Sequence, residues 1–247
     1  MTKTLILIPS RMDATRLPGK PLLKINNLSI VSHVFKRAEE ANIGEVVVAA
    51  DDEEIIKDIL KNGGNAILTN KNHKTGTDRI FEAYENLNIK NVDYILNLQG
   101  DEPNINKDDI INLNNLMINQ DVEMGTLAAK INDNKILNNK NVVKVVTNNH
   151  LDKKNFPLAL KFTRDNLSEF YQNIYHHIGI YSYKVSTLKK FVSLTQTKKE
   201  IENKLEQLRA LDNEIKINVA LAKSSPIGVD TEEDYLAIKK IMEYKLK

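Results

Sequence analysis

Three cations follow the first apolar stretch of the chain, "TLILIPS", within ten residues. They are Arg11, Arg16 and Lys20, and Gly19 directly precedes the last of them. Guanidinium groups grip phosphate oxygens in pairs, lysine adds a point charge, and glycine lets the backbone approach a ligand closely. The segment matches neither G-x-G-x-x-G nor the P-loop pattern. It therefore indicates a polyphosphate-binding loop of another kind, with a basic solvated loop as the alternative.

The segment "QGDEP" presents an amide and a carboxylate after a second apolar stretch. Asp101 could hold a hard cation such as Mg²⁺, which is bound in proteins by one or two carboxylates together with substrate phosphates. Gln99 could recognise a small ligand by hydrogen bonds. The alternative for Asp101 is a helix N-cap. Asp230, in "GVDTEED", is also a capping candidate, and becomes a metal ligand only if it meets Asp101.

A third polar segment, "TGTDR", lies before an expected helix. Backbone N–H groups and hydroxyls at Thr75, Gly76 and Thr77 could bind a base or a phosphate there. Capping of the helix is the alternative, and the segment alone does not decide between them.

Composition excludes several other kinds of site. The chain of 247 residues has no cysteine, so it has no disulfide, no thiolate zinc site and no catalytic thiol. His176 and His177 lack the spacing of a zinc site, and no G-x-S-x-G elbow is present. A net charge of +2 argues against a nucleic-acid binder. No signal peptide or apolar run of about 20 residues occurs, so we expect a cytoplasmic protein without a membrane span.

The elements expected around these segments alternate between strand and helix. Continuous apolar strands are expected at 4–8, 45–50, 66–69 and 92–100, and helices at 29–42, 52–64 and 77–87. This order predicts an α/β fold with a mostly parallel sheet covered by helices on both faces. Ligands bind at the carboxyl ends of such strands, and polar clusters fall there: the cations after Ile8, Asp51 and Asp52 after Ala50, and "QGDEP" after Leu98.

The pattern changes after about residue 120. Strand-like segments follow with less helix between them, then a helix at 198–211, another strand, and a terminal helix with an acidic first turn. We therefore expect a single domain over 1–247, in which about 130–215 form a smaller β-rich lobe.

The chain resembles the 3-deoxy-manno-octulosonate cytidylyltransferase family over nearly its whole length. The motifs that carry the resemblance, in order, are "IPSRMDATRLPGKPL", "HKTGTDR", "NLQGDEP", "NVVKVV", "HHIGIYSY", "LEQLR" and "GVDTEED". The resemblance implies a Rossmann-like nucleotidyltransferase sheet with a lobe that also forms a homodimer. It implies transfer of CMP from CTP to the acid sugar Kdo, with Mg²⁺ and release of pyrophosphate, for lipopolysaccharide biosynthesis.

The resemblance also implies roles for particular residues. Arg11, Arg16 and Lys20 match the triphosphate loop, and Asp101 and Asp230 match the metal pair. Residues that match the nucleotide site further include Thr75, Gly76, Thr77 and Gln99. Those that match the sugar-acid pocket are Gln99, Arg164, His177, Tyr181, Glu206 and Gln207, and Arg164 is the expected partner of the Kdo carboxylate.

The chain departs from the family pattern at three places. Ala14 stands where the family usually has serine, Ala50 where it has threonine, and the segment after Arg164 reads "DNLSEFYQN" where a longer loop is common. The last departure bears on the sugar pocket.

Three other functions stay open on the sequence. The chain could be a cytidylyltransferase for a different acid sugar, such as 8-amino-Kdo or a sialic acid. It could be a non-catalytic nucleotide-binding protein, although Asp101 and Asp230 are both present. A nucleic-acid binder is disfavoured by the charge balance and by the lack of interleaved aromatic residues.

Overall fold

The computed structural model describes residues 2–13, 16–167 and 171–244, and the chain falls into two compact units. Unit 1 consists of residues 1–110 and 226–247, and unit 2 of residues 111–225. The segment expected as a β-rich lobe, about 130–215, lies inside unit 2. Ala14 lies outside the described residues, as do residues 168–170 of the loop after Arg164.

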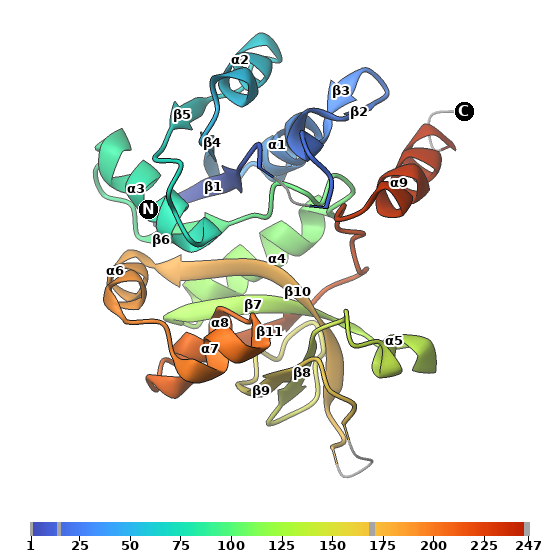
Figure 1. Ribbon diagram of the computed structural model, residues 1–247. Coiled ribbons are helices and arrows are strands. Elements are labelled where there is room, and N and C mark those ends of the chain that lie inside the picture. The colour runs from blue at the N-terminus through green and yellow to red at the C-terminus, as the bar shows by residue number, and fades with distance from the viewer. Residues whose placement is uncertain (1, 14–15, 168–170, 245–247) are drawn as a thin grey trace. The chain divides into compact units, whose positions relative to one another are not determined.

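Unit 1 is built on four parallel strands in the order β6–β1–β4–β5 (Figure 1). These are β1 (Thr4–Ser10), β4 (Gly44–Ala50), β5 (Ala66–Leu68) and β6 (Tyr94–Asn97). The apolar residues of β1 from Leu5 to Ile8 are fully buried, which explains why the strand is apolar on both faces. The predicted α/β fold with a mostly parallel sheet is confirmed. The strand expected at 92–100 is shorter, because the chain leaves the sheet after Asn97.

Helices α1 (Ile30–Ala41), α2 (Glu53–Lys61) and α3 (Gly76–Leu87) connect these strands and flank the sheet. Polar caps fix where they begin: the side chains of Ser29 and Asp52 accept backbone N–H bonds at the starts of α1 and α2. Helix α4 (Lys107–Asn119) then runs from unit 1 into unit 2.

The C-terminal helix α9 (Glu232–Tyr244) packs against a small hairpin that the sequence analysis did not predict. The hairpin follows the single-turn helix η1 (Lys20–Leu22) and pairs β2 (Lys24–Ile25) with β3 (Leu28–Ser29). A buried cluster of Ile25, Ile30, Val229, Ile238 and Met242 joins the two. This packing brings the segment before α9 to the first loop of the chain.

Unit 2 contains both antiparallel and parallel strand pairs. Its strands are β7 (Met124–Lys130), β8 (Lys144–Thr147), β9 (Ala159–Thr163), β10 (Ile174–Lys184) and β11 (Asn218–Leu221). β10 pairs antiparallel with β7 and β8, β8 pairs antiparallel with β9, and β11 pairs parallel with β7. The change of pattern expected after residue 120 is therefore a mixed arrangement of strands.

The helices of unit 2 are short. They are α5 (Asn134–Asn138), α6 (Val185–Ser193), α7 (Lys198–Asn203) and α8 (Gln207–Asp212). The prediction of one continuous helix at 198–211 is wrong, because Lys204 adopts a left-handed conformation with φ of 52°. The break ends α7 and starts α8 at Gln207. No helix in the described part of the chain combines the length and the apolar character needed to cross a membrane.

Candidate functional site

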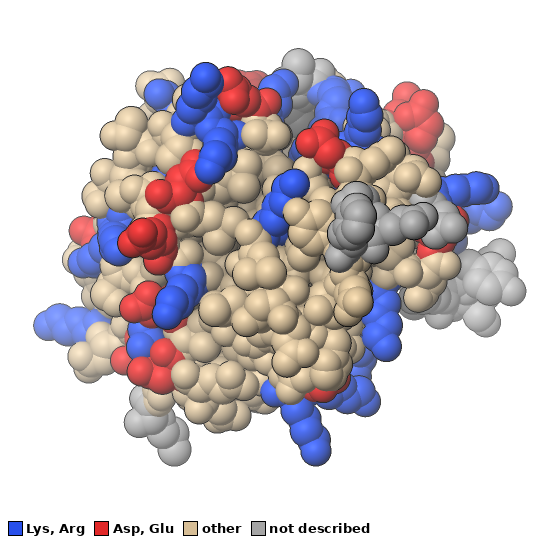
Figure 2. Space-filling model, turned by 90° about the horizontal axis from the view of Figure 1, so that it is seen from below, with Lys and Arg blue, Asp and Glu red and all other residues tan. Residues whose placement is uncertain are grey.

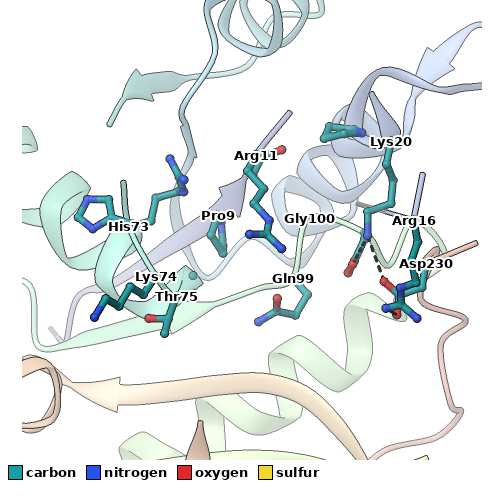
Figure 3. A pocket seen from close by; sticks show the side chains of 15 residues that line it. Pro9, Arg11, Arg16, Lys20, His73, Lys74, Thr75, Gln99, Gly100 and Asp230 are labelled. Atoms are coloured by element: carbon teal, nitrogen blue, oxygen red, sulfur yellow. Dashed lines mark hydrogen bonds and ion pairs between the residues drawn. The ribbon is translucent and has the colours of Figure 1, made fainter. Parts of the chain in front are cut away.

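A cavity of about 450 Å³ lies in unit 1 at the carboxyl ends of β1 and β6 (Figure 3). This volume is in the range of small-molecule sites. The chain leaves β1 toward β4 on one side, whereas β6 lies on the other side of β1, so the cavity sits where the strand order reverses. The lining residues are Pro9, Ser10, Arg11, Arg16, Lys20, Pro21, His73, Lys74, Thr75, Gly76, Arg79, Gln99, Gly100, Asp101 and Asp230.

The structure joins two of the predicted cations, Arg16 and Lys20, to both predicted carboxylates, while Arg11 lines the same cavity. Lys20 Nζ donates to Asp101 Oδ2 at 2.7 Å and lies 3.4 Å from Asp230 Oδ1. Arg16 Nη2 lies 3.0 Å from Asp230 Oδ2. Gly19, with φ of 69°, makes the left-handed turn that starts the short helix carrying Lys20. Figure 3 shows the Lys20 contacts as dashed lines.

Other residues carry the helix caps that were the alternative roles of these aspartates. Asn106 Oδ1 accepts from the Asp108 N–H at the start of α4. At α9, the Thr231 hydroxyl accepts from the Asp234 N–H while Asp234 Oδ2 accepts from the Thr231 N–H. The Asp101 carbonyl accepts from the Val229 N–H at 2.9 Å, which ties the two aspartate segments together.

Asp101 and Asp230 fit a hard divalent cation. Their carboxylates converge on one positive group, the Lys20 ammonium, which marks the point that their oxygens share. Among the described residues no group of three or more His, Cys, Asp or Glu side chains forms a metal cage. A pair of carboxylates completed by phosphate oxygens and water is the donor set typical of Mg²⁺.

Glu102, next to Asp101, adds no charge at neutral pH. Burial, and then the charge of Asp101, raise the pKa of Glu102 to about 8. The negative charge at this corner of the cavity therefore belongs to Asp101 and Asp230.

The other wall of the cavity is formed by the start of α3. The Thr75 side chain accepts from the Asp78 N–H at 3.1 Å, so capping is one role of this residue. Gly76 lies against Pro9, since an added Cβ would be 3.2 Å from the proline ring. Thr77 is buried behind the wall, and its hydroxyl accepts a weak bond from Asn97 Nδ2 at 3.5 Å.

Sequence reasoning missed Arg79 as a functional residue, although the quoted motif "TGTDR" ends on it. Its guanidinium is buried, pairs with Asp51 Oδ2 at 3.0 Å and donates to Thr69 Oγ1 at 2.7 Å. The other carboxylate oxygen of Asp51 accepts from the Met12 N–H at 3.0 Å. The pair thus joins the loop that carries Arg11 to β4, β5 and α3.

His73 and Lys74 also line the cavity and were not predicted. His73 Nε2 pairs with Glu82 Oε2 on α3, and Glu82 also accepts from the Asn70 N–H at 2.9 Å. The sequence signal was their place in "HKTGTDR", directly before Thr75.

In unit 2 the structure gathers four of the residues that the resemblance assigned to a sugar-acid pocket. His177 Nε2 lies 3.0 Å from the Tyr181 hydroxyl and 3.1 Å from Thr126 Oγ1. The Arg164 guanidinium is close enough to affect the pKa of His177, and Glu206 is close enough to affect that of Tyr181. We call Arg164, His177, Tyr181 and Glu206 the unit 2 cluster. Gln207 is buried at the start of α8, next to Glu206.

Burial keeps the aromatic members of the unit 2 cluster neutral. It lowers the pKa of His177 to about 3, helped by the charges of His176 and Arg164. Burial, with Tyr183 and Glu206, raises the pKa of Tyr181 well above its usual value. The pair therefore offers neutral hydrogen-bonding groups at any physiological pH.

Lys144 is a further buried cation, which the sequence analysis quoted within the motif "NVVKVV" without giving it a role. It is fully buried, and Nζ donates to the Arg164 carbonyl at 2.7 Å and to the Asn139 carbonyl at 3.1 Å. Burial lowers its pKa. Arg164 Nη1 in turn donates to the Asn141 carbonyl at 2.7 Å. The available signal was a lysine within the apolar run "NVVKVV".

The chain is similar in sequence to cytidylyltransferases. The model of a family described as cytidylyltransferase matches residues 5–217. The 3-deoxy-manno-octulosonate cytidylyltransferase of Nitrobacter hamburgensis is 42% identical over 98% of this chain and 93% of its own length. The protein of that name from Thermodesulfovibrio yellowstonii is 42% identical over 97% of this chain and 98% of its own.

Solved structures agree with these relatives. A CMP:2-keto-3-deoxy-manno-octonic acid synthetase complexed with CTP is 32% identical, has a TM-score of 0.90, and covers 99% of this chain and 100% of that one. A cytidylyltransferase from Leptospira borgpetersenii shares the fold, with a TM-score of 0.65 and 21% identity over 99% of this chain and 88% of that one.

Proposed function

Because the chain belongs to the 3-deoxy-manno-octulosonate cytidylyltransferase family, we propose that it transfers CMP from CTP to Kdo and releases pyrophosphate. One observation carries the proposal furthest. The unit 1 cavity joins three cations to two carboxylates that converge on a single point, Lys20 Nζ. Such an arrangement suits a triphosphate and its metal ion.

The cations of the first loop have two tasks in this reaction. Arg11, Arg16 and Lys20 offset the charge of the triphosphate, so that a second anion, the sugar acid, can approach. They also stabilise the negative charge that develops on the leaving pyrophosphate. A preorganised contact of this kind is worth about 3–4 kcal/mol of barrier, or about 10²–10³ in rate. Thr75, Gly76 and Gln99 line the same cavity and are the proposed contacts of the nucleoside.

Asp101 and Asp230 are the proposed ligands of Mg²⁺. When bound, the ion supplies Lewis-acid polarisation of the phosphate under attack. The role of the chain is to present two carboxylates on separate segments and to fix the distance between them. The bond from the Val229 N–H to the Asp101 carbonyl does this through the backbone.

The unit 2 cluster is the proposed binding site of the sugar acid. Arg164 is the partner for the carboxylate, because a guanidinium binds carboxylate oxygens in a fork. His177 and Tyr181 offer neutral groups for sugar hydroxyls, and Glu206 and Gln207 can accept from others. The Lys144 ammonium donates to the carbonyl of Arg164 and so holds the backbone that carries the guanidinium.

We propose further that the protein works as a cytoplasmic homodimer in lipopolysaccharide biosynthesis, as the family implies. Figure 2 shows a tan area without charge, interrupted by a blue side chain, between charged side chains. Depletion of charge in the centre of a surface is typical of subunit interfaces. An exposed leucine on β9, Leu160, also favours a covered surface.

The test is pyrophosphate release from CTP with a panel of acid sugars: Kdo, 8-amino-Kdo and a sialic acid. We expect Kdo to be the preferred acceptor, and Asp101→Asn to lower the rate by about 10²–10³ while the circular dichroism spectrum is unchanged. Asp108→Asn, which changes an exposed acid at the start of α4, is the matched control. Preference for another sugar would reassign the acceptor, and full activity of Asp101→Asn would refute the metal role.

A further inference from the structure

Lys20 occupies an unusual place for a phosphate-binding lysine. Its ammonium is largely buried, with 14% of the side chain exposed, and it contacts both carboxylates of the proposed metal pair. The contact with Asp101 is a short charged hydrogen bond of 2.7 Å, and Asp230 Oδ1 lies at 3.4 Å. Lys20 is thus an internal counter-ion of Asp101 and Asp230.

A divalent cation on the same carboxylates would compete with this ammonium. Mg²⁺ requires oxygens at about 2.0–2.1 Å in near-ideal geometry, and Asp101 Oδ2 cannot serve the metal and the ammonium without change. Two positive groups held a few ångströms apart also repel strongly outside bulk water. Binding of the metal therefore requires Lys20 to give up at least its contact with Asp101.

The cavity provides a second anionic partner for Lys20 when a triphosphate is bound. Lys20 lines the same cavity as Arg11 and lies on a short helix whose backbone is fixed by Gly19 and Pro21. The lysine side chain is a flexible stem with three donors, so the ammonium can turn while the backbone stays in place. Arg16 also pairs with one of the aspartates, Asp230, at 3.0 Å and would also compete with a metal ion there. That pair is exposed, so its contribution to the competition is smaller.

We propose that Lys20 couples the two ligands of the site: it competes with the divalent cation for Asp101 and Asp230, and the triphosphate releases it from them. This inference rests on the proposed function, because it takes the two aspartates as metal ligands. Bound nucleotide then raises the affinity for the metal, and bound metal raises the affinity for the nucleotide by the same factor, as linkage requires. The lysine proposed to bind phosphate is then expected also to weaken metal binding by the protein without nucleotide.

If Lys20 only bound phosphate, its removal would leave metal binding by the nucleotide-free protein unchanged. The counter-ion role predicts a different result. Removal of the ammonium should tighten metal binding to the nucleotide-free protein, although it weakens the use of CTP. Mn²⁺ is a suitable probe, since it shares the carboxylate preference of Mg²⁺ and its free concentration can be followed by electron paramagnetic resonance. We expect Lys20→Met to bind Mn²⁺ about tenfold more tightly than the unchanged protein, the value of one charged hydrogen bond.

Lys74→Met is the matched control for a general loss of positive charge. Lys74 lines the same cavity, and no ion pair joins it to either aspartate within the described ranges of the chain. Its substitution should change the Mn²⁺ affinity less than about twofold, since only a longer-range charge is lost. In the double variant Lys20→Met/Asp101→Asn the gain should disappear.

Mn²⁺ binding by Lys20→Met that is unchanged, weaker or equal to that of Lys74→Met would overturn the counter-ion role. A gain that persists in the double variant would also overturn it. Pyrophosphate release by the unchanged protein separates this failure from failure of the proposed function. If CTP and Kdo react but Lys20→Met gains no affinity, only the coupling is wrong. If they do not react, the function is wrong, and tighter Mn²⁺ binding by Lys20→Met would still support competition at the aspartates.

Discussion

The unit 1 cavity is lined by basic and acidic side chains, such as Arg11, Lys20 and Asp101, whereas the unit 2 cluster is centred on His177 and Tyr181, which burial keeps neutral. The ligands proposed for the two regions differ in the same way. A triphosphate carries several charges and needs compensation. A sugar carries one carboxylate and many hydroxyls, for which neutral donors and acceptors are better suited.

Each region is supported by one buried arginine–carboxylate pair, and the two pairs are built differently. Arg79 shares Asp51 with the backbone N–H of Met12, so this pair holds a ligand-binding loop. Arg209 binds both oxygens of Glu200, at 2.9 Å from Nε and 2.6 Å from Nη2, and its guanidinium stacks 4.6 Å from the Phe191 ring. The second pair holds two helices together across their break.

The difference shows where each region needs rigidity. In unit 1 the loop after β1 must keep its cations in place against one another. In unit 2, Glu206 is the N-cap of α8 and Gln207 is its first residue, and the Arg209–Glu200 pair ties α8 to α7. Both pairs are therefore expected to stabilise the fold equally, but to affect the use of different substrates.

The largest expected effect is on stability. Arg79→Met and Arg209→Met each leave a buried carboxylate without its partner, which typically costs about 3–5 kcal/mol. We expect both variants to lose about this much free energy of unfolding, measured by urea denaturation. Arg37→Met is the control, because Arg37 pairs with Glu40 at the surface, where such a pair is worth at most about 1 kcal/mol. A loss no larger than that of the control would show that the pair in question is not a structural tie.

The second effect is a dependence of stability on pH that belongs to unit 2. The folded pKa of His177, about 3, lies below its unfolded value of 6.5. The stability that neutral His177 gives is complete above pH 6.5 and is lost as the pH falls, since only the unfolded chain then binds the proton. The loss reaches about 2 kcal/mol at pH 5.

His177→Gln should make the fall in unfolding free energy between pH 6 and 5 shallower, by up to about 1.4 kcal/mol per pH unit. Urea denaturation at a series of pH values measures this slope. His176 also has a lowered pKa, and its contribution to the slope is expected to be the same in His177→Gln and in the unchanged protein. Equal slopes for His177→Gln and the unchanged protein would contradict the buried neutral state.

The smallest effect is kinetic and separates the two pairs. Lysine keeps the charge of Arg79 or Arg209 but cannot make the forked contacts. We expect Arg79→Lys to raise the KM for CTP about tenfold with the KM for the sugar unchanged, and Arg209→Lys to do the reverse. Initial rates with one substrate varied at a time measure both constants. A parallel rise of both constants in either variant would show that its pair does not act on one substrate alone.

The meeting of polar segments at one edge of the unit 1 sheet could be predicted from the sequence, for a physical reason. Strand ends of a parallel sheet meet at one edge, so polar segments after 4–8 and 92–100 had to lie together. The contact between Lys20 and Asp101 is the result. The resemblance placed Asp230 at the same point, which no local pattern could do, because a buried cluster between α9 and the hairpin brings it there.

The parts that the sequence did not predict depend on tertiary contacts. The segment "KKEIENKLEQLRAL" has the pattern of one helix. The structure has two helices, with Lys204 in a left-handed conformation between them, and this arrangement allows the ion pair between Arg209 and Glu200. The hairpin of β2 and β3 was too short for periodicity to reveal, and only Asn26 and Asn27, both with positive φ, mark its turn. Lys144 was given no role because a lysine within an apolar run shows that something unusual is there but not which carbonyl groups it contacts.

Gly100 has a consequence for how this site can change over time. A Cβ at this position would lie 2.8 Å from the Pro9 carbonyl oxygen, a backbone atom that cannot move aside as a side chain would. The distance between the backbones of Gly100 and Pro9, which both line the cavity, therefore leaves no room for a side chain at position 100. Single substitutions can change the side chains that line the rest of the cavity, but a substitution of Gly100 would require the backbone to move. New substrate preferences in this lineage are expected to arise from the walls.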